Sequence, residues 1–210
     1  MQLTNKQRVL KLAGCLFSRP QYILPYFSSN LRPSRHSPLD QNLPWWSFAA
    51  IEEADRLFPG KRIFEWGSGG STLRYSKMGA TITAIEDDKR WLTLVQLALE
   101  EAGVDKSVVL NFVPFDFDYP VDFSSSDYLK QLGNEFWDVV IIDGQDKTFR
   151  ERIACFRQAE KFAHPDSIIL VDDFWRYEEL LDSNSAKNVK VFESVGPCRI
   201  GVTSTAMFFY

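Results

Sequence analysis

Residues 62–71 read Arg-Ile-Phe-Glu-Trp-Gly-Ser-Gly-Gly-Ser, an apolar run that passes directly into a glycine-rich turn. The run has the length of a buried strand, and a helical pattern follows from about residue 71. Glycines at such a turn let the backbone approach a ligand closely at the carboxyl end of a sheet. A tight strand-to-helix turn without a ligand would use the same glycines, so this segment alone leaves both interpretations open.

The alternation of short apolar runs and helical patterns continues along the chain. Further strand-like runs stand at 81–85, 108–113, 139–142 and 168–171, separated by helical patterns. Near-continuous apolar strands between helices predict an α/β fold, a doubly wound and mostly parallel sheet in three layers. No helical pattern separates the last two strand-like runs, 189–192 and 206–210, so we expect an antiparallel hairpin there.

The first 43 residues differ from the rest in charge and pattern. A helical pattern over 4–17 is followed by a proline-rich segment over 18–44, which predicts a helical arm and a loop. Residues 1–39 carry six Lys and Arg and no acid, which leaves the remainder at about −10. The arm is suited to an anionic substrate, an acidic membrane surface or a nucleic acid, or it is a solvated extension on an acidic domain. A helix from Pro44 would begin the domain proper, residues 44–210.

Composition limits the class of protein. A chain of 210 residues with 14% aromatic residues and a net charge of −4 fits one soluble, cytoplasmic domain. The three cysteines form no CxxC pair, and no apolar run is long enough to span a membrane. Because the domain is acidic, we expect no nucleic-acid partner. The sequence leaves both a monomer and a homodimer open.

Two further strand ends carry groups that suit a nucleoside. Glu86 ends the second strand nineteen residues after Gly67, close to the offset at which a carboxylate meets ribose hydroxyls. Asp87 is adjacent, and Asp88 is expected to cap the next helix. After the third strand, Asp116 is a candidate to accept from an adenine amino group, with Phe115 either stacked on the ring or part of the core.

Carboxylates also follow the fourth and fifth strands, at Asp143, Asp172 and Asp173. Parallel strands end at the same edge of a sheet, so we expect these three side chains to lie close together. Oxygen ligands of this kind suit Mg²⁺ or Ca²⁺. The alternative is that one carboxylate caps a helix and another orients a substrate.

Together these motifs resemble class I S-adenosylmethionine-dependent methyltransferases over residues 44–210, in a poorly characterised branch similar to small-molecule O-methyltransferases. The resemblance implies a seven-stranded sheet of order 3-2-1-4-5-7-6 with strand 7 antiparallel. It also implies that S-adenosylmethionine is bound, with the carboxylate of Glu65 near its ammonium group, by Glu65, Gly67, Ser68, Gly69, Ser71, Glu86, Asp87, Phe115, Asp116 and Asp143.

The spacing of Asp143 and Asp172-Asp173 further resembles metal-dependent catechol-type enzymes, which would imply Mg²⁺. Two residues depart from the family pattern: Ser71 replaces the third glycine of the turn, and Asp173 replaces the usual Asn of the metal triad. No Asn-Pro-Pro-Tyr motif follows the fourth strand, where Asp143-Gly144-Gln145-Asp146 stands instead. The absence of that motif favours oxygen over an amine as the methyl acceptor.

Methyl transfer requires alignment of the acceptor with the methyl group and a base that removes the acceptor's proton. The candidate bases are Asp143, Asp172 and His36. The acceptor is expected to be a small molecule, and an anionic one would find candidate partners in Arg150, Arg152 and Arg176.

Two rival functions remain at this point. A nicotinamide-dependent oxidoreductase shares the fold class and the ribose carboxylate, but its third turn glycine would stand where this chain has Thr72, and no Tyr-x-x-x-Lys pair is present. A non-catalytic protein that binds a nucleotide or S-adenosylmethionine is the other rival.

Overall fold

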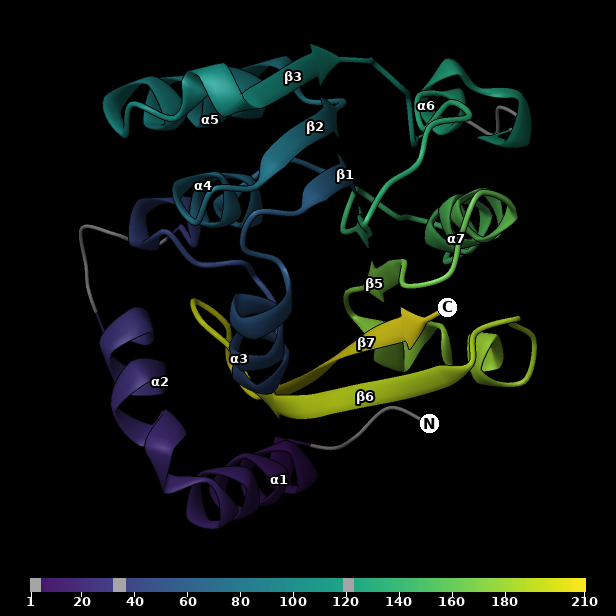
Figure 1. Cartoon of the computed structure of the whole chain (residues 1–210). Helices are drawn as coiled ribbons and strands as arrows, with labels where there is room; N and C mark the ends of the chain where they lie inside the picture. The colour runs from purple at the N-terminus through teal and green to yellow at the C-terminus, as the bar shows by residue number, and fades with distance from the viewer. Residues whose placement is uncertain (1–4, 32–36, 119–122) are drawn as a thin grey trace.

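A single mixed sheet forms the centre of the molecule. The computed structural model describes residues 5–31, 37–118 and 123–210. Within these residues seven strands pair in the order β3-β2-β1-β4-β5-β7-β6 (Figure 1). Their bounds are β1 Arg62–Trp66, β2 Thr81–Glu86, β3 Val108–Phe112, β4 Val139–Ile142, β5 Ile168–Val171, β6 Asn188–Val195 and β7 Val202–Phe209. Only β7 pairs in the antiparallel sense, with β5 and with β6, so the expected strand order is confirmed.

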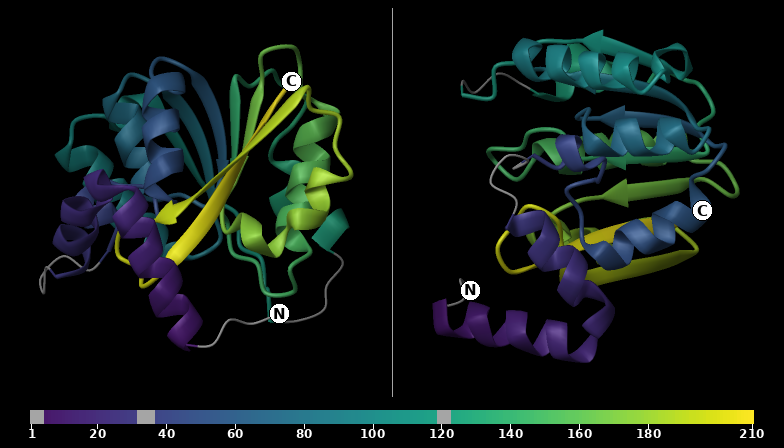
Figure 2. Two further views of the ribbon diagram at one scale, coloured as in Figure 1. Left: turned by 90° about the horizontal axis from the view of Figure 1, so that it is seen from below. Right: turned by 90° about the vertical axis from the view of Figure 1, so that its left-hand side faces the viewer.

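Helices cover both faces of the sheet and give the three expected layers (Figures 1 and 2). One face carries α3 (Phe48–Leu57), α4 (Gly70–Lys77) and α5 (Lys89–Glu101), and the other carries α6 (Asp127–Lys130) and α7 (Glu151–Lys161). Along β4, Val139 and Ile141 pack on the α3 side while Val140 and Ile142 pack on the α7 side. A strand with two covered faces must be apolar at every position, which is why it reads as a continuous run.

Local capping decides where the helices begin. Ser47 Oγ accepts from the Ala50 amide at 3.2 Å, so α3 starts at Phe48 rather than at Pro44 as expected. The predicted cap Asp88 accepts from the amides of Arg90 and Trp91 at 2.7 and 3.2 Å, and this prediction is confirmed.

The amino-terminal arm contains more helix than the prolines suggested. Besides α1 (Asn5–Ser18), a second helix, α2 (Ile23–Asn30), lies inside the segment expected to be a loop. Pro25 is tolerated because it occupies the first turn, where an amide has no intrahelical partner.

Figure 2 shows the arm beside the β6 end of the sheet. Lys11 Nζ pairs with Glu193 Oε2 at 2.8 Å, and Tyr22 Oη donates to Glu52 at 2.7 Å. The boundary at residues 43 and 44 stays a prediction.

The hairpin at the carboxyl terminus is longer than predicted. Its second strand begins at Val202 rather than at Ala206, and the added residues Thr203, Ser204 and Thr205 are buried. Because these three residues are polar, they do not continue the apolar run that begins at Ala206. No described helix has the length and apolarity needed to cross a bilayer.

Candidate functional site

The glycine-rich turn lies against the loop that follows β4. Gly67 has φ of 89°, a conformation that side chains rarely adopt, and its amide donates to Ile85 O at 2.9 Å. A Cβ added there would lie 2.6 Å from Gly144 Cα. Gly67 is therefore required both by its own backbone and by the close approach of the two loops.

Glu65 holds the turn to the start of α4. Its side chain is fully buried, and its carboxylate accepts from Ser71 Oγ and, at 2.6 Å, from Thr72 Oγ1. Burial raises the pKa of Glu65 to about 8, against the lowering effect of the two hydroxyl donors. Ser71, which departs from the glycine pattern, thus supplies a donor to a buried carboxylate that would otherwise lack it.

Glu86 connects the turn after β1 with the turn after β2. Its carboxylate accepts from Ser68 N at 3.1 Å and Ser68 Oγ at 2.8 Å, and from the amides of Asp87 and Asp88, each at 3.1 Å. Burial raises the pKa of Glu86, while these donors lower it. The structure therefore brings Glu86 and Ser68 together at the carboxyl edge of the sheet, as expected for a shared binding site.

An open cavity of about 490 Å³ continues from this point across the ends of β2, β3 and β4. It brings together three residues predicted to contact a nucleoside and several that were not predicted; the lining residues are Asp87, Pro114, Phe115, Asp116, Phe117, Asp118, Gln145 and Lys147. Burial raises the pKa of Asp87 to about 6. The volume lies in the range of small-molecule sites. Gln145 and Lys147 follow Asp143 in sequence, and the strand-end rule could have found them.

Tyr128 was not found from the sequence. Its hydroxyl is buried and has no hydrogen-bond partner among the described residues. It would lie 2.4 Å from a Cβ added at Gly144, so it stands behind the loop that faces Gly67. A buried hydroxyl without a partner is costly, and a ligand atom at this edge would satisfy it.

Asp143, at the end of β4, is held from two sides. Trp46 Nε1 donates to its Oδ2 at 3.0 Å, and Arg152 Nη2 lies 3.1 Å from its Oδ1. Arg152 is itself buried and also donates to the backbone carbonyls of Gly144 and Asp172, each at 2.9 Å. Burial raises the pKa of Asp143, and Arg152 lowers it. Arg152 is thereby committed to the fold rather than to an acceptor.

Asp172 and Asp173, after β5, also form ion pairs with arginine side chains. Thr205 Oγ1 donates to Asp172 Oδ1 at 2.6 Å, and burial raises the pKa of Asp172 well above its usual range. Asp173 Oδ1 accepts from Arg199 Nη2 at 2.8 Å, and Arg176 Nη2 lies 3.5 Å from its Oδ2. Burial opposes ionisation of Asp173, but the arginines outweigh it and lower its pKa.

These contacts do not fit a metal centre. The described residues contain no group of three or more His, Cys, Asp and Glu side chains arranged to hold an ion. The predicted ligands Asp143, Asp172 and Asp173 instead pair with Arg152, Arg176 and Arg199. A cation would compete with guanidinium groups already in place, so the Mg²⁺ expectation finds no support in the geometry.

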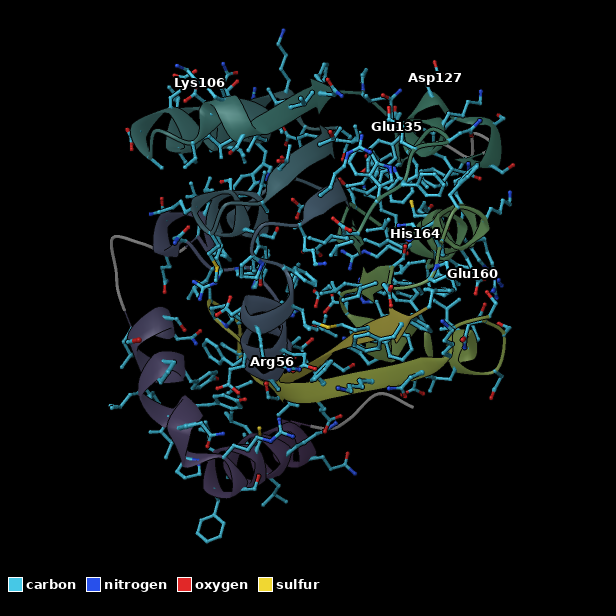
Figure 3. All side chains as sticks on the ribbon, in the orientation of Figure 1. Arg56, Lys106, Asp127, Glu135, Glu160 and His164 are labelled. Carbon is cyan, nitrogen blue, oxygen red and sulfur yellow. The ribbon has the colours of Figure 1, made fainter. Side chains whose placement is uncertain are left out.

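The predicted base His36 and the predicted anion partner Arg150 are the remaining candidates. His36 lies outside the described residues. His164, labelled in Figure 3, contacts Trp137 O at 3.1 Å, beside the amino end of β4 and so away from the carboxyl edge. Arg150 is exposed and lies 4.0 Å from Glu179.

Comparison with known proteins agrees with this architecture. No protein-family model matches the sequence, and no curated protein matches it. Among solved structures, the O-methyltransferase from Bacillus cereus in complex with SAH is 18% identical with a TM-score of 0.57, over 94% of this chain and 89% of that one. TomG from Streptomyces achromogenes, an O-methyltransferase involved in tomaymycin synthesis and solved with SAM, is 17% identical with a TM-score of 0.60, over 99% and 100%. The fold is that of a class I methyltransferase.

A third structure also aligns over the arm. Cofactor-bound Rv0187 from MTB is 16% identical with a TM-score of 0.61, and the alignment covers 100% of this chain and 98% of that one. The likeness to the methyltransferase fold therefore includes the amino-terminal residues as well as the sheet. In this fold the Gly67 turn, Glu86 and Asp143 all lie at the carboxyl ends of β1, β2 and β4.

Proposed function

We propose that this protein transfers the methyl group of S-adenosylmethionine to an oxygen atom of a small-molecule acceptor. The observation that carries the proposal is the joint position of the Gly67 turn, Glu86 and the 490 Å³ cavity at one edge of the sheet. Oxygen is favoured by the loop Asp143-Gly144-Gln145-Asp146, and two of the similar structures carry the name O-methyltransferase.

In this proposal, different residues would bind the amino-acid end, the ribose and the adenine ring of the cofactor. The turn from Gly67 to Ser71 would hold the amino-acid end, with Glu65 acting through the shape of the turn because its oxygens already bind Ser71 and Thr72. Glu86 would take the ribose hydroxyls when Ser68 Oγ rotates away, and the cavity lined by Phe115 and Asp116 would take the adenine ring. When bound, the sulfonium supplies an electrophilic methyl group.

Asp143 is the best placed base. Its side chain is 19% exposed, against 4% for Asp172, so Asp143 is the one of the two that an acceptor can reach. Trp46 and Arg152 hold its carboxylate in one orientation, which suits a group that must meet a hydroxyl in a fixed geometry.

Calorimetry tests which cofactor the protein binds. S-adenosylmethionine and S-adenosylhomocysteine should bind, and NAD⁺ and NADP⁺ should not. Glu86→Ala should weaken binding by about tenfold or more, because a charge-assisted hydrogen bond to the ribose is lost. Asp88→Ala serves as the matched control, since Asp88 caps α5 from the same loop. Unchanged affinity in Glu86→Ala would remove this residue from the site.

Turnover distinguishes an enzyme from a binding protein. Release of S-adenosylhomocysteine in the presence of a hydroxylated acceptor supports the proposal. Tight cofactor binding with no release across a broad panel of acceptors would favour the non-catalytic alternative. Binding of NAD⁺ instead of S-adenosylmethionine would favour the oxidoreductase.

A further inference from the structure

Three exposed aromatic rings and two arginines gather beyond β5. Trp45, Phe149 and Trp175 are 51%, 50% and 55% exposed, although large aromatic side chains normally bury most of their surface. They come from the segment before α3, the loop before α7 and the short 3₁₀ helix Phe174–Arg176 after β5. Arg176 and Arg199 lie among them, and we call these five residues the aromatic–arginine patch.

Asp173 joins the patch into one unit. Arg199 Nη2 donates to its Oδ1 at 2.8 Å, and Arg176 Nη2 lies 3.5 Å from its Oδ2. The Arg176 guanidinium carbon is 4.9 Å from the Trp175 ring centre and 5.3 Å from that of Phe149. These contacts show that the rings flank the arginines and are not scattered over the surface.

Arg199 extends the patch to the third ring. Its guanidinium carbon lies 5.9 Å from the Trp45 ring centre, and its Nη1 donates to Trp45 O at 3.1 Å. Arg199 lies in the loop between β6 and β7, and this loop therefore places its guanidinium group at the edge of the sheet.

One arginine has an unused donor. Arg176 Nε is buried and has no hydrogen-bond partner among the described residues. A guanidinium N–H that is removed from water without an acceptor is costly, and an anionic ligand is the partner that suits its planar geometry best.

The patch borders the site of methyl transfer. Arg199 Nη1 lies 3.8 Å from Asp172 Oδ2, and Trp45 immediately precedes Trp46, whose indole binds Asp143. The charges of Asp173 and Arg199 also act on the Asp143 carboxyl, so a molecule held on the patch would lie beside Asp143.

We propose that the methyl acceptor is a planar anionic molecule, an aryl carboxylate with a ring hydroxyl, whose carboxylate binds Arg176 and Arg199 and whose ring stacks among Trp45, Phe149 and Trp175. This inference rests on the proposed function. The hydroxyl oxygen forms the new bond to the methyl carbon as the carbon–sulfur bond breaks, its electron pair stays on sulfur, and the hydroxyl proton passes to Asp143. The guanidinium groups take the place that a metal ion would have in orienting the acceptor.

The test compares charged and neutral acceptors of one shape. Protein saturated with S-adenosylhomocysteine is titrated with a panel of hydroxybenzoates and with the matching hydroxybenzamides, and binding is followed by calorimetry and by quenching of tryptophan fluorescence. The acids should bind about tenfold or more tightly than their amides, because a carboxylate accepts charge-assisted hydrogen bonds from arginine. Arg176→Gln should remove most of this preference. Arg56→Gln should retain it, because Arg56 is exposed, pairs with Glu53 on α3 and lies outside the patch.

The outcomes separate the two proposals. If S-adenosylhomocysteine binds but no acid in the panel binds more tightly than its amide, the acceptor class is wrong and the cofactor assignment stands. If the cofactor itself does not bind, the proposed function fails first. An unchanged preference in Arg176→Gln would overturn the role of this residue. Arg199→Gln, checked for folding by its Tm, gives an independent second measurement.

Discussion

The indole nitrogen of Trp46 lies 3.0 Å from Asp143 Oδ2 and joins the segment before α3 to the end of β4. Trp46 is fully buried and stacks on Tyr75 with ring centres 6.0 Å apart. The orientation of the candidate base is thus fixed by a residue almost a hundred positions away in sequence.

Trp46→Phe tests this link. The change keeps most of the ring packing but removes the only N–H of the side chain, so we expect a loss of about 1–3 kcal/mol in the free energy of unfolding, measured by urea denaturation. Trp45→Phe, at an exposed ring, should change it by less than about 0.5 kcal/mol. Equal effects of the two substitutions would show that the hydrogen bond from Trp46 to Asp143 does not contribute to the free energy of unfolding.

Asp143→Asn should abolish turnover while cofactor binding persists. The amide cannot accept the acceptor's proton, and it leaves the buried Arg152 without its charge partner, which costs about 3 kcal/mol of stability. Calorimetry with S-adenosylhomocysteine and release of S-adenosylhomocysteine from S-adenosylmethionine are the two measurements. Retained turnover at the wild-type rate would remove Asp143 from the catalytic residues.

Gly67→Ala should destabilise the protein and eliminate cofactor binding. The new methyl group would lie 2.6 Å from Gly144 Cα, on a backbone with φ of 89°. Gly69→Ala is the matched control for stability, because its φ of 170° is ordinary extended backbone and the nearest atom is 3.7 Å away on Trp91. Similar Tm values for the two variants would contradict the close approach.

The raised pKa of Glu65 predicts that the stability of the protein depends on pH. Its pKa in the folded protein is about 8, against an ordinary value of 4.5, so the folded protein holds a proton that the unfolded chain releases. The free energy of unfolding should therefore fall as the pH rises from about 4.5 to 8 and level off above this window. Asp87, with a pKa of about 6, contributes in the same direction.

Glu65→Gln, which resembles the protonated acid, should flatten this decline, so its Tm relative to the wild-type Tm should be higher at pH 8 than at pH 5.5. Glu101→Gln, at an exposed position, should follow the wild-type profile. Parallel wild-type and Glu65→Gln profiles would mean that Glu65 is ionised in the folded protein.

Metal chelation gives a further prediction. Because arginines pair with Asp143, Asp172 and Asp173, EDTA should leave turnover and Tm unchanged, and added Mg²⁺ should not raise turnover. Loss of activity in EDTA that Mg²⁺ restores would show that the arginines move aside for a metal ion.

The sequence by itself determined the architecture. Strands such as Val139–Ile142 read as continuous apolar runs because helices cover both faces, and this pattern identifies a parallel sheet without any knowledge of contacts. Glycine at 67 and the acids at 86, 143 and 172 follow strand ends, and parallel strands end at one edge. Their convergence could therefore be predicted from order alone.

Only the tertiary structure decided which partner each of these groups has. Arg199 reaches Asp173 from the β6–β7 loop, and Trp46 reaches Asp143 from before α3; neither pairing has a local sequence signal. The three carboxylates suggested a metal site in sequence, whereas in the structure they pair with Arg152, Arg176 and Arg199, of which Arg199 comes from a distant segment. Sequence pattern reports the periodicity of burial along one segment, whereas charge compensation depends on the distance between segments, which exists only after the chain has folded.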